Sequence, residues 1–551
     1  MKIVFKKQNE LAFFSVTLIF IASRFVLFNG FHGTDDLHYA MLAAKMTKAA
    51  YTPFQPNDIF SGRILLIAWQ AFIYKIGGIS VFTTTAGNIA AIILSCRLTI
   101  YRILPLRHPG ATLLTCCLFY FNAKLAADIT GISPDPYVLL IGVCITILLK
   151  NNLTATLPQK KSITNAILIG VLIAVSVLIK ETILVFLPFS IAALCIYRGK
   201  RGLLNSFYLL FSFIALVGLF VYGYYYFTGD PFFKATQIEN SNYPNACNFA
   251  FMPAKELMIR LSYGVWQSFI VYGFYPCLLG LIALIVQFRR QKSLSPSRAQ
   301  DIVLFCLLLV ISIYFPFSLH GYQPLCAVPR QFMFLVPLAA AVFTPLLIDA
   351  RCMEKNKQQL AILSFILLVV CISSTLNKWQ WMIYSIFFIY FLLQYRWQLP
   401  AKFHFIFFSI VLFASNFEGL FFNNARWFAD MKQLNRDIHS NYYYFADQEN
   451  MAHWNLLTRF DTTIHNYNME AHPYKVFQVY YQLPDTINFH PGWFIVNSVF
   501  TDRPRSFVGR MDSLQQTGFF SACKAVGNMR AFSLDNEKQF SYLKAIIARQ
   551  Q

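Results

Sequence analysis

Charge is scarce in this sequence. Only 13% of the 551 residues are Asp, Glu, Lys or Arg, whereas charged residues make up about a quarter of a typical soluble domain. Hydrophobic residues account for 57% of the chain. The shortage of charge excludes an ordinary soluble enzyme, and the long apolar runs indicate a protein that crosses a membrane many times.

Several signature motifs are absent as well. The sequence contains no P-loop, GxGxxG, HExxH or GxSxG motif, which argues against an ATP-driven pump, a Rossmann enzyme, a zinc protease and a serine hydrolase. The 12 cysteines lie mostly inside apolar runs and show no paired spacing. The sequence therefore predicts neither a zinc site nor a disulfide framework.

The apolar runs predict a polytopic helical membrane protein, because a membrane-crossing helix needs about 20 apolar residues. The segment 62–79 is apolar too, but we interpret it as an interfacial helix anchored by Trp69, Tyr74 and Lys75. About thirteen spans are predicted, near residues 11–29, 80–101, 110–127, 134–150, 162–179, 182–197, 203–227, 265–287, 301–318, 332–350, 359–375, 379–394 and 403–420.

The positive charges predict the orientation of these spans. With thirteen spans, the basic residues that flank them, such as Lys150, Arg198 and Arg289, fall on one side, which the positive-inside rule makes cytoplasmic. The N-terminus is then cytoplasmic, and the long loops lie outside. Much of the net charge of +21 is explained in this way, so no nucleic acid partner is predicted.

Two parts of the chain differ in composition. Residues 1–420 form the predicted membrane module, and residues 30–79 are its first external loop. Residues 421–551 are rich in Tyr, Asn, Asp and His, with strand-like runs at 492–500 and 529–535 and a helix-like segment at 507–518. The predicted fold class is an all-α polytopic membrane protein with a small C-terminal extracytoplasmic α/β domain.

The stretch FHGTDDLHYA, residues 31–40, carries two adjacent carboxylates just beyond the first span. Asp35 and Asp36 begin a helical pattern for which Thr34 is a suitable N-cap. Neighbouring residues on a helix point about 100° apart, so the two carboxylates are expected to do different jobs. His38 and Tyr39 follow closely. A hydrated loop is the simpler alternative for this pair.

Other charged residues lie near predicted membrane boundaries. Arg63 begins the interfacial helix and suits either a substrate phosphate or a lipid phosphate. Asp135 lies between two prolines at the end of a span. Lys180 and Glu181 interrupt an apolar stretch, where a charge at membrane depth costs about 2.5–3.5 kcal/mol and needs a partner; the alternative is an ordinary outer turn.

A late loop adds three more candidates. The segment LHGYQPLCAVPRQFMFLVPLA, residues 319–339, places His320, Tyr322 and Arg330 just outside a span. One arginine beside a span is common, but the prolines and aromatic residues here indicate a shaped loop.

Six segments in this order carry a further signal: DDLHYAMLAAKM, GRILLIAW, GISPDPYVLLIGVCITILL, GVLIAVSVLIKETILVFLP, YYYFTGDPFF and VPRQFMFLVPL. Together they resemble segments of the GT-C fold glycosyltransferases, and most of all of the bacterial relatives of protein O-mannosyltransferases and of the aminoarabinose transferases of lipid A. Compared with that family, Asp-Asp replaces the commoner Asp-Glu, His38 stands where an Arg is common, and Ser-Gly-Arg replaces a Glu-Lys-Pro whose Glu is a metal ligand.

The resemblance implies a membrane enzyme that takes a sugar from a polyprenyl-phosphate-linked donor. It implies inverting transfer to a hydroxyl of a lipid, glycan or protein acceptor, on the outer face of a bacterial inner (cytoplasmic) membrane. Asp35 is then the general base and Asp36 orients or binds substrate. Arg63, together with Arg330 or Lys180, then binds the donor phosphate and stabilises its negative charge. The other substrate-binding candidates are His38, Tyr39, Asp135, Glu181, His320 and Tyr322.

The sequence leaves more than one possibility open for the cofactor and for the function. The sequence establishes no cofactor and leaves a divalent metal ion open, since Asp35, Asp36 and a histidine are ligand types for such an ion. A transporter or flippase of lipid-linked glycans, a polymerase or ligase of external polysaccharide, and a scaffold whose external domain binds a partner are the competing functions.

Overall fold

A computed structural model of the protein gives its fold. It describes residues 2–26, 31, 34–55, 58, 60–104, 108–121, 132–154, 157–240, 249, 252–288, 295–317, 322–348, 356–397, 399–415, 427–438, 443–446, 448–461, 466–468, 491–497, 505–527 and 529–549.

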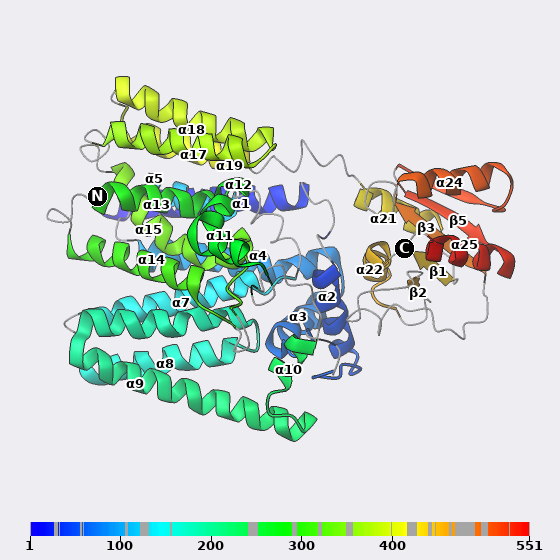
Figure 1. The fold of residues 1–551 in the computed structure, drawn as a ribbon, viewed down its shortest axis with the longest axis horizontal. Helices are drawn as coiled ribbons and strands as arrows, with labels where there is room; N and C mark the ends of the chain where they lie inside the picture. Colours follow the sequence, from blue (N-terminus) through cyan, green and yellow to red (C-terminus); the bar gives the residue numbers. More distant parts are fainter. Residues whose placement is uncertain are drawn as a thin grey trace.

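Apolar helices lie side by side in one bundle (Figure 1). Neighbouring pairs such as α8 and α9, α13 and α15, and α17 and α18 pack along their lengths, and their apolar side chains form one large buried cluster. The helices of the bundle are α1 (Lys2–Val26), α4 (Val81–Leu98), α5 (Pro109–Tyr120), α7 (Asp135–Leu153), α8 (Gln159–Ser176), α9 (Phe186–Thr228), α12 (Val265–Val271), α13 (Tyr275–Phe288), α14 (Pro296–Tyr314), α15 (Val336–Ile348), α17 (Lys357–Ser374), α18 (Lys378–Arg396) and α19 (Ala401–Ser415).

Each predicted span coincides, at least in part, with one of these helices. In the described part of the chain, six helical segments are long and apolar enough to cross a membrane. Others, such as α5, are apolar but shorter, so the count of thirteen stays a prediction. The six are Val81–Ile103, Asp135–Leu153, Glu181–Thr228, Pro296–Tyr314, Pro329–Ile348 and Lys357–Ser374.

Backbone turns at two glycines relate the predicted spans to the observed helices. The predicted spans 182–197 and 203–227 correspond to the two parts of α9, which are separated by a sharp turn at Gly199, where φ is 50° and ψ is −124°. Glycine adopts this left-handed conformation without steric cost. The predicted span 265–287 is instead interrupted between α12 and α13, where Gly273 has a φ of 63°.

Two short helices, α2 (Thr34–Thr47) and α3 (Ile64–Gly77), pack against each other at one end of the bundle (Figure 1). Helix α3 buries Leu66 and Ile67 and exposes Trp69, as expected of an interfacial helix. The predicted anchoring role of Tyr74 is wrong, because its side chain is buried and its hydroxyl lies 2.8 Å from Thr84 Oγ1. Tyr74 therefore joins α3 to α4.

Short helical elements lie between the longer helices along the chain. They are the π-helical turns η1 (Thr99–Ile103) and η4 (Arg260–Gly264), the 3-10 helices η2 (Glu181–Val185) and η6 (Pro329–Leu335), and the helices α10 (Phe233–Asn240) and α11 (Ala254–Ile259).

The C-terminal residues form a five-stranded sheet with the order β2-β1-β3-β5-β4. Strand β1 is parallel to β2 and β3, and β5 is antiparallel to β3 and β4. The predicted strands near 492 and 529 and the predicted helix near 507 are confirmed. The strands are β1 (Tyr443–Ala446), β2 (Asn466–Asn468), β3 (Gly492–Asn497), β4 (Cys523–Val526) and β5 (Met529–Leu534), and the helices are α21 (Trp427–Asp437), α22 (Gln448–Leu457), α24 (Arg505–Gln516) and α25 (Glu537–Arg549).

The two faces of this sheet pack against different helices, because side chains alternate along a strand. On β3, Ile495 belongs to the cluster that contains α21, α22 and α2, whereas Phe494 and Val496 belong to the cluster that contains α24 and α25. Helix α22 contacts α2 directly. In addition, the Phe31 backbone N–H donates to His453 Nε2 at 3.3 Å. The sheet is therefore held beside the segment that carries the acidic pair.

Candidate functional site

Helix α2 places its first-turn side chains in different surroundings. Asp35 is half-buried, and in the part of the chain that the structure describes no hydrogen bond reaches its carboxylate. Asp36 is 8% exposed and Tyr39 is 1% exposed. Because residues i and i+4 share one face of a helix, Asp35 and Tyr39 lie together and Asp36 points elsewhere. The predicted division of roles within the pair agrees with this geometry.

Arg63 reaches the same face of α2 from the turn before α3. Its Nη1 donates a hydrogen bond to the Tyr39 hydroxyl, and its Nη2 lies 3.6 Å from Glu181 Oε2. The guanidinium also lies 5.7 Å from the centroids of the Tyr39 and Phe60 rings. Arg63 is thus fixed between α2 and the start of η2.

Two further ion pairs continue from this point. Lys234, in α10, places its Nζ 2.8 Å from Glu181 Oε1. Lys180 Nζ lies 2.6 Å from Asp135 Oδ1, and the Ser133 hydroxyl donates to the other oxygen of Asp135. Lys180 and Glu181 do lie in the connection between α8 and α9, as the outer-turn alternative has it, and both are also engaged with charges from other segments.

The electrostatics join these pairs into one cluster, which we call the charged cluster: Asp35, Arg63, Asp135, Lys180, Glu181, Lys234 and Arg330. Burial lowers the pKa of Lys180, and the positive charges of Arg63 and Arg330 lower it further against the opposing effect of Asp135. Arg330, in η6, is therefore close enough to act on Lys180. The cations of the cluster outnumber its carboxylates.

Tyr39 stays protonated in this setting. Burial raises the pKa of its hydroxyl, and the carboxylates of Asp35 and Glu181 raise it further, against the lowering effect of Arg63. A neutral phenol is a hydrogen-bond donor as well as an acceptor. The arrangement therefore sets a half-exposed carboxylate beside a phenol and several fixed cations.

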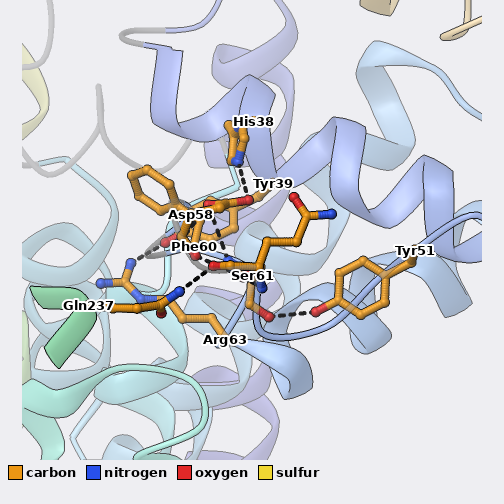
Figure 2. Close-up of polar contacts among 9 residues, drawn as sticks. His38, Tyr39, Tyr51, Asp58, Phe60, Ser61, Arg63 and Gln237 are labelled. Carbon is orange, nitrogen blue, oxygen red and sulfur yellow. Dashed lines mark hydrogen bonds and ion pairs between the residues drawn. The ribbon is translucent and has the colours of Figure 1, made fainter. Parts of the chain in front are cut away.

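His38, which directly precedes Tyr39 in α2, is not a member of the charged cluster. It is completely buried, and its Nε2 lies 2.9 Å from Asp58 Oδ2 (Figure 2). A direct substrate contact by His38 stays a prediction, and the observed partner of the imidazole is a carboxylate of the first loop.

The late loop contributes to the site unevenly. Tyr322 accepts a hydrogen bond at its backbone oxygen from the Phe249 N–H and lies near Arg260, whose Nη2 donates to two backbone carbonyls. Among the described residues, the interactions of Tyr322 are thus with Phe249 and Arg260, whereas Arg330 acts electrostatically on Lys180. His320 lies outside the described residues.

Two residues that the sequence reasoning missed take part. Lys234 directly follows the family-like segment YYYFTGDPFF, which offered a signal. Asp58 lies in the loop before Arg63. The sequence offers no signal for it, and only the structure shows that it pairs with His38. Cys326, whose N–H donates to Gln331 Oε1 beside Arg330, is part of a disulfide that the cysteine spacing did not predict.

No ligand set for a metal ion is found in the parts of the chain that the structure describes: no three His, Cys, Asp or Glu side chains gather there as ligands. The divalent metal ion that the sequence leaves open therefore stays a prediction.

Comparison with known proteins rests on structure alone, because no protein-family model and no curated protein matches the sequence. ArnT from Cupriavidus metallidurans is similar over 94% of this chain and 97% of its own, with 12% identity and a TM-score of 0.53, both in the apo state and bound to undecaprenyl phosphate. An oligosaccharyltransferase from Archaeoglobus fulgidus matches 82% of this chain and 63% of its own, at 11% identity and a TM-score of 0.44. The similarity to ArnT shows that this chain has the GT-C fold that its sequence segments predict.

Proposed function

We propose that the protein is an integral membrane glycosyltransferase. It transfers a sugar from a polyprenyl-phosphate-linked donor to an acceptor hydroxyl, with inversion and with Asp35 as the general base. The acceptor is a lipid, a glycan or a protein. No nucleotide-binding fold is needed, because the donor is held in the membrane by its own lipid, and a divalent metal ion is the one cofactor that the sequence leaves open.

One observation carries this proposal: the half-exposed carboxylate of Asp35 acts on Arg63 and Tyr39 at the edge of a cluster of fixed cations. A base for an acceptor and a cationic site for a phosphate thus lie side by side. They lie where apolar helices end, which suits a substrate whose lipid is in the bilayer. ArnT, which has the same fold, has been crystallised with undecaprenyl phosphate.

The reaction follows from these positions. Asp35 accepts the proton of the acceptor hydroxyl as its oxygen attacks the anomeric carbon, which contributes about 10²–10⁴-fold to the rate in comparable systems. The bond from the anomeric carbon to the phosphate oxygen breaks on the opposite side, and the electron pair leaves with the polyprenyl phosphate. Arg63, Lys180, Lys234 and Arg330 stabilise the charge that develops there.

The other residues of the site support these groups. Tyr39 donates a hydrogen bond to substrate or to Asp35, Asp135 pairs with Lys180, and Glu181 pairs with Lys234 and Arg63. Asp36 orients the acceptor side from the neighbouring face of α2. Tyr322 and His320 contact the acceptor from the late loop.

The orientation is part of the proposal. Cys326 lies in the loop that leads into η6 and Arg330, and disulfides persist in oxidising compartments outside the cytosol. This supports an extracytoplasmic charged cluster. At the opposite end of the bundle, Lys150 and Arg198 donate to the backbone carbonyls of Ile103 and Thr154, and we assign this basic end to the cytoplasm by the positive-inside rule.

The proposed topology therefore has about thirteen spans in a bacterial inner membrane, with the N-terminus in the cytoplasm. The membrane module covers residues 1–420, and residues 421–551 form an external domain next to the acceptor side.

The proposal is tested with Asp35→Asn. Mass spectrometry of lipid, glycan and protein fractions from cells with and without the gene identifies the product, and the variant should form it at least about 100 times more slowly. The purified variant should bind undecaprenyl phosphate as the wild type does, because the cations are intact. Glu256→Gln, at an exposed position on α11, is the matched control. Product formation by Asp35→Asn at the wild-type rate would overturn the assignment.

A further inference from the structure

We propose that Asp58 is a positioning residue that fixes Arg63 against Tyr39. We call the turn that the Asp58 carboxylate holds the clamp, and His38 anchors this clamp to α2. The inference rests on the proposed function, in which Arg63 meets the donor phosphate, and it gives His38 a role that does not require contact with substrate.

The Asp58 carboxylate is shared between a helix and a loop (Figure 2). Its Oδ2 lies 2.9 Å from His38 Nε2, one turn along α2 from Asp35. Its Oδ1 accepts the backbone N–H of Phe60 at 2.9 Å and that of Ser61 at 3.3 Å. Asp58 is 1% exposed, so each of its oxygens finds its partner inside the protein.

The clamped turn leads directly to Arg63. The Ser61 hydroxyl donates to the Asp58 carbonyl at 2.7 Å, and the Arg63 N–H donates to the Phe60 carbonyl at 3.0 Å. The Phe60 ring meets Tyr39 edge to face at 5.2 Å, and the Arg63 guanidinium lies over it. The backbone between Asp58 and Arg63 therefore has little freedom to move away from α2.

A second layer of hydrogen bonds extends the clamp to α10. The Tyr51 hydroxyl donates to the Ser61 carbonyl at 2.6 Å, and the Gln55 N–H donates to the Ser61 hydroxyl at 2.9 Å. Gln237, in α10, donates through its amide to the Gln55 carbonyl. Gln237 is three residues beyond Lys234, so the clamp connects the two cations that flank Glu181.

The chemistry of Asp58 favours this role over simple packing. A buried carboxylate is costly unless it is paired and hydrogen-bonded, and an apolar side chain would fill the same space at lower cost. A carboxylate with two oxygens can do what an apolar residue cannot: it joins an imidazole on one element to two backbone N–H groups on another.

The test uses the purified full chain with undecaprenyl phosphate as the probe. Asp58→Ala should weaken binding about tenfold and expose the Phe60 and Ser61 amides to hydrogen exchange. In an Arg63→Ala background, Asp58→Ala should cause no further loss of binding, because its effect acts through Arg63. Asp58→Asn should restore most of the binding, since its carbonyl still accepts the backbone N–H groups and its amide can donate to His38 Nε2.

Asp301→Ala is the control for a general loss of structure, because Asp301 is an equally buried ion-paired carboxylate at the other end of the bundle. It should lower the melting temperature and leave lipid binding unchanged. An equal loss of binding in Asp58→Ala with and without Arg63, or no greater loss than in Asp301→Ala, would overturn the inference.

The outcome also separates this inference from the proposed function. A wild-type protein that binds no undecaprenyl phosphate defeats the proposed phosphate site. The clamp is then judged by melting temperatures: Asp58→Ala and Arg63→Ala should together lower the melting temperature by less than the sum of their separate shifts. Fully additive shifts, with the Phe60 and Ser61 amides still protected in Asp58→Ala, would refute the clamp on its own.

Discussion

Helix α7 carries the same kind of ion pair at each of its ends. At the N-terminal end, Lys180 Nζ lies 2.6 Å from Asp135 Oδ1, and at the C-terminal end Lys150 Nζ lies 2.5 Å from Asp301 Oδ1. Each pair joins a residue of α7 to a residue of another segment, and all four side chains are mostly buried. As isolated pairs they are nearly indistinguishable.

Their surroundings differ. Arg63 and Arg330 act on Lys180, and a half-exposed Asp35 lies on the far side of Arg63. Lys150 instead donates to the backbone carbonyl of Ile103, and no second ion pair adjoins it among the described residues. An isolated ion pair has no net charge with which to bind an anionic ligand, whereas a cluster with more cations than carboxylates has a net positive charge. The surroundings, not the pair, therefore distinguish the proposed binding site from the contact at the other end of α7.

The largest expected effect comes from removing one lysine at each end. Lys180→Met and Lys150→Met each remove the ion-pair partner of a buried carboxylate, and each should destabilise the protein by about 3–5 kcal/mol. Only Lys180→Met should weaken undecaprenyl phosphate binding, by about 30-fold, as expected for a charge-assisted hydrogen bond worth about 2 kcal/mol. Thermal unfolding and lipid binding in detergent measure both quantities. An equal loss of lipid binding in Lys180→Met and Lys150→Met would contradict the proposed difference between the two ends of α7.

Replacing both partners sharpens the comparison. Lys150→Met/Asp301→Leu should recover the stability that the single change loses, because a buried pair can often be exchanged for apolar residues without cost. Lys180→Met/Asp135→Leu should also regain stability but should remain about 30-fold weaker in lipid binding. Recovery of binding in this second variant would show that Lys180 only neutralises Asp135.

Much of the helical architecture could be predicted from the sequence, since apolar runs of sufficient length have few other uses. The break between 197 and 203 agrees with the turn at Gly199, but the prediction failed at Gly273, because hydropathy does not show a left-handed glycine. It also failed at Tyr74, whose hydroxyl finds Thr84 on a neighbouring helix.

The candidate site was predictable in part, for a related reason. Charges in apolar surroundings need partners, and this marked Asp135, Lys180 and Glu181 as residues to bring together. The identity of the partners depends on tertiary packing, which no spacing reveals. Asp58 was missed because a carboxylate in a Pro/Asn/Gly loop looks hydrated, and only the fold buries it against His38.

A smaller effect is expected from pH. Burial lowers the pKa of Lys180 below its usual range, so this lysine loses its proton at a lower pH than an exposed lysine does. Undecaprenyl phosphate binding should therefore weaken up to about tenfold as the pH rises toward 10. Stability should change in the opposite direction, because the unfolded chain binds more protons than the folded chain in that interval.

Lys180→Arg is the control for this pH dependence, since a guanidinium keeps its charge throughout the range. Its lipid binding should stay constant between pH 7 and pH 10. A wild-type protein whose binding is equally constant would contradict a titrating Lys180 at the phosphate site.

The smallest expected effect has the opposite sign to the others. Glu181 lies 2.8 Å from Lys234 Nζ and 3.6 Å from Arg63 Nη2, so it competes with a phosphate for both cations. Glu181→Gln keeps a carbonyl for Lys234 and removes the negative charge, which should tighten undecaprenyl phosphate binding about threefold, in the range of partly exposed ion pairs. Asp301→Asn removes a charge beside Lys150 and should leave binding unchanged. Weaker binding in Glu181→Gln would mean that the carboxylate holds the two cations in place more than it opposes the phosphate, and the site would then depend on its anions as much as on its cations.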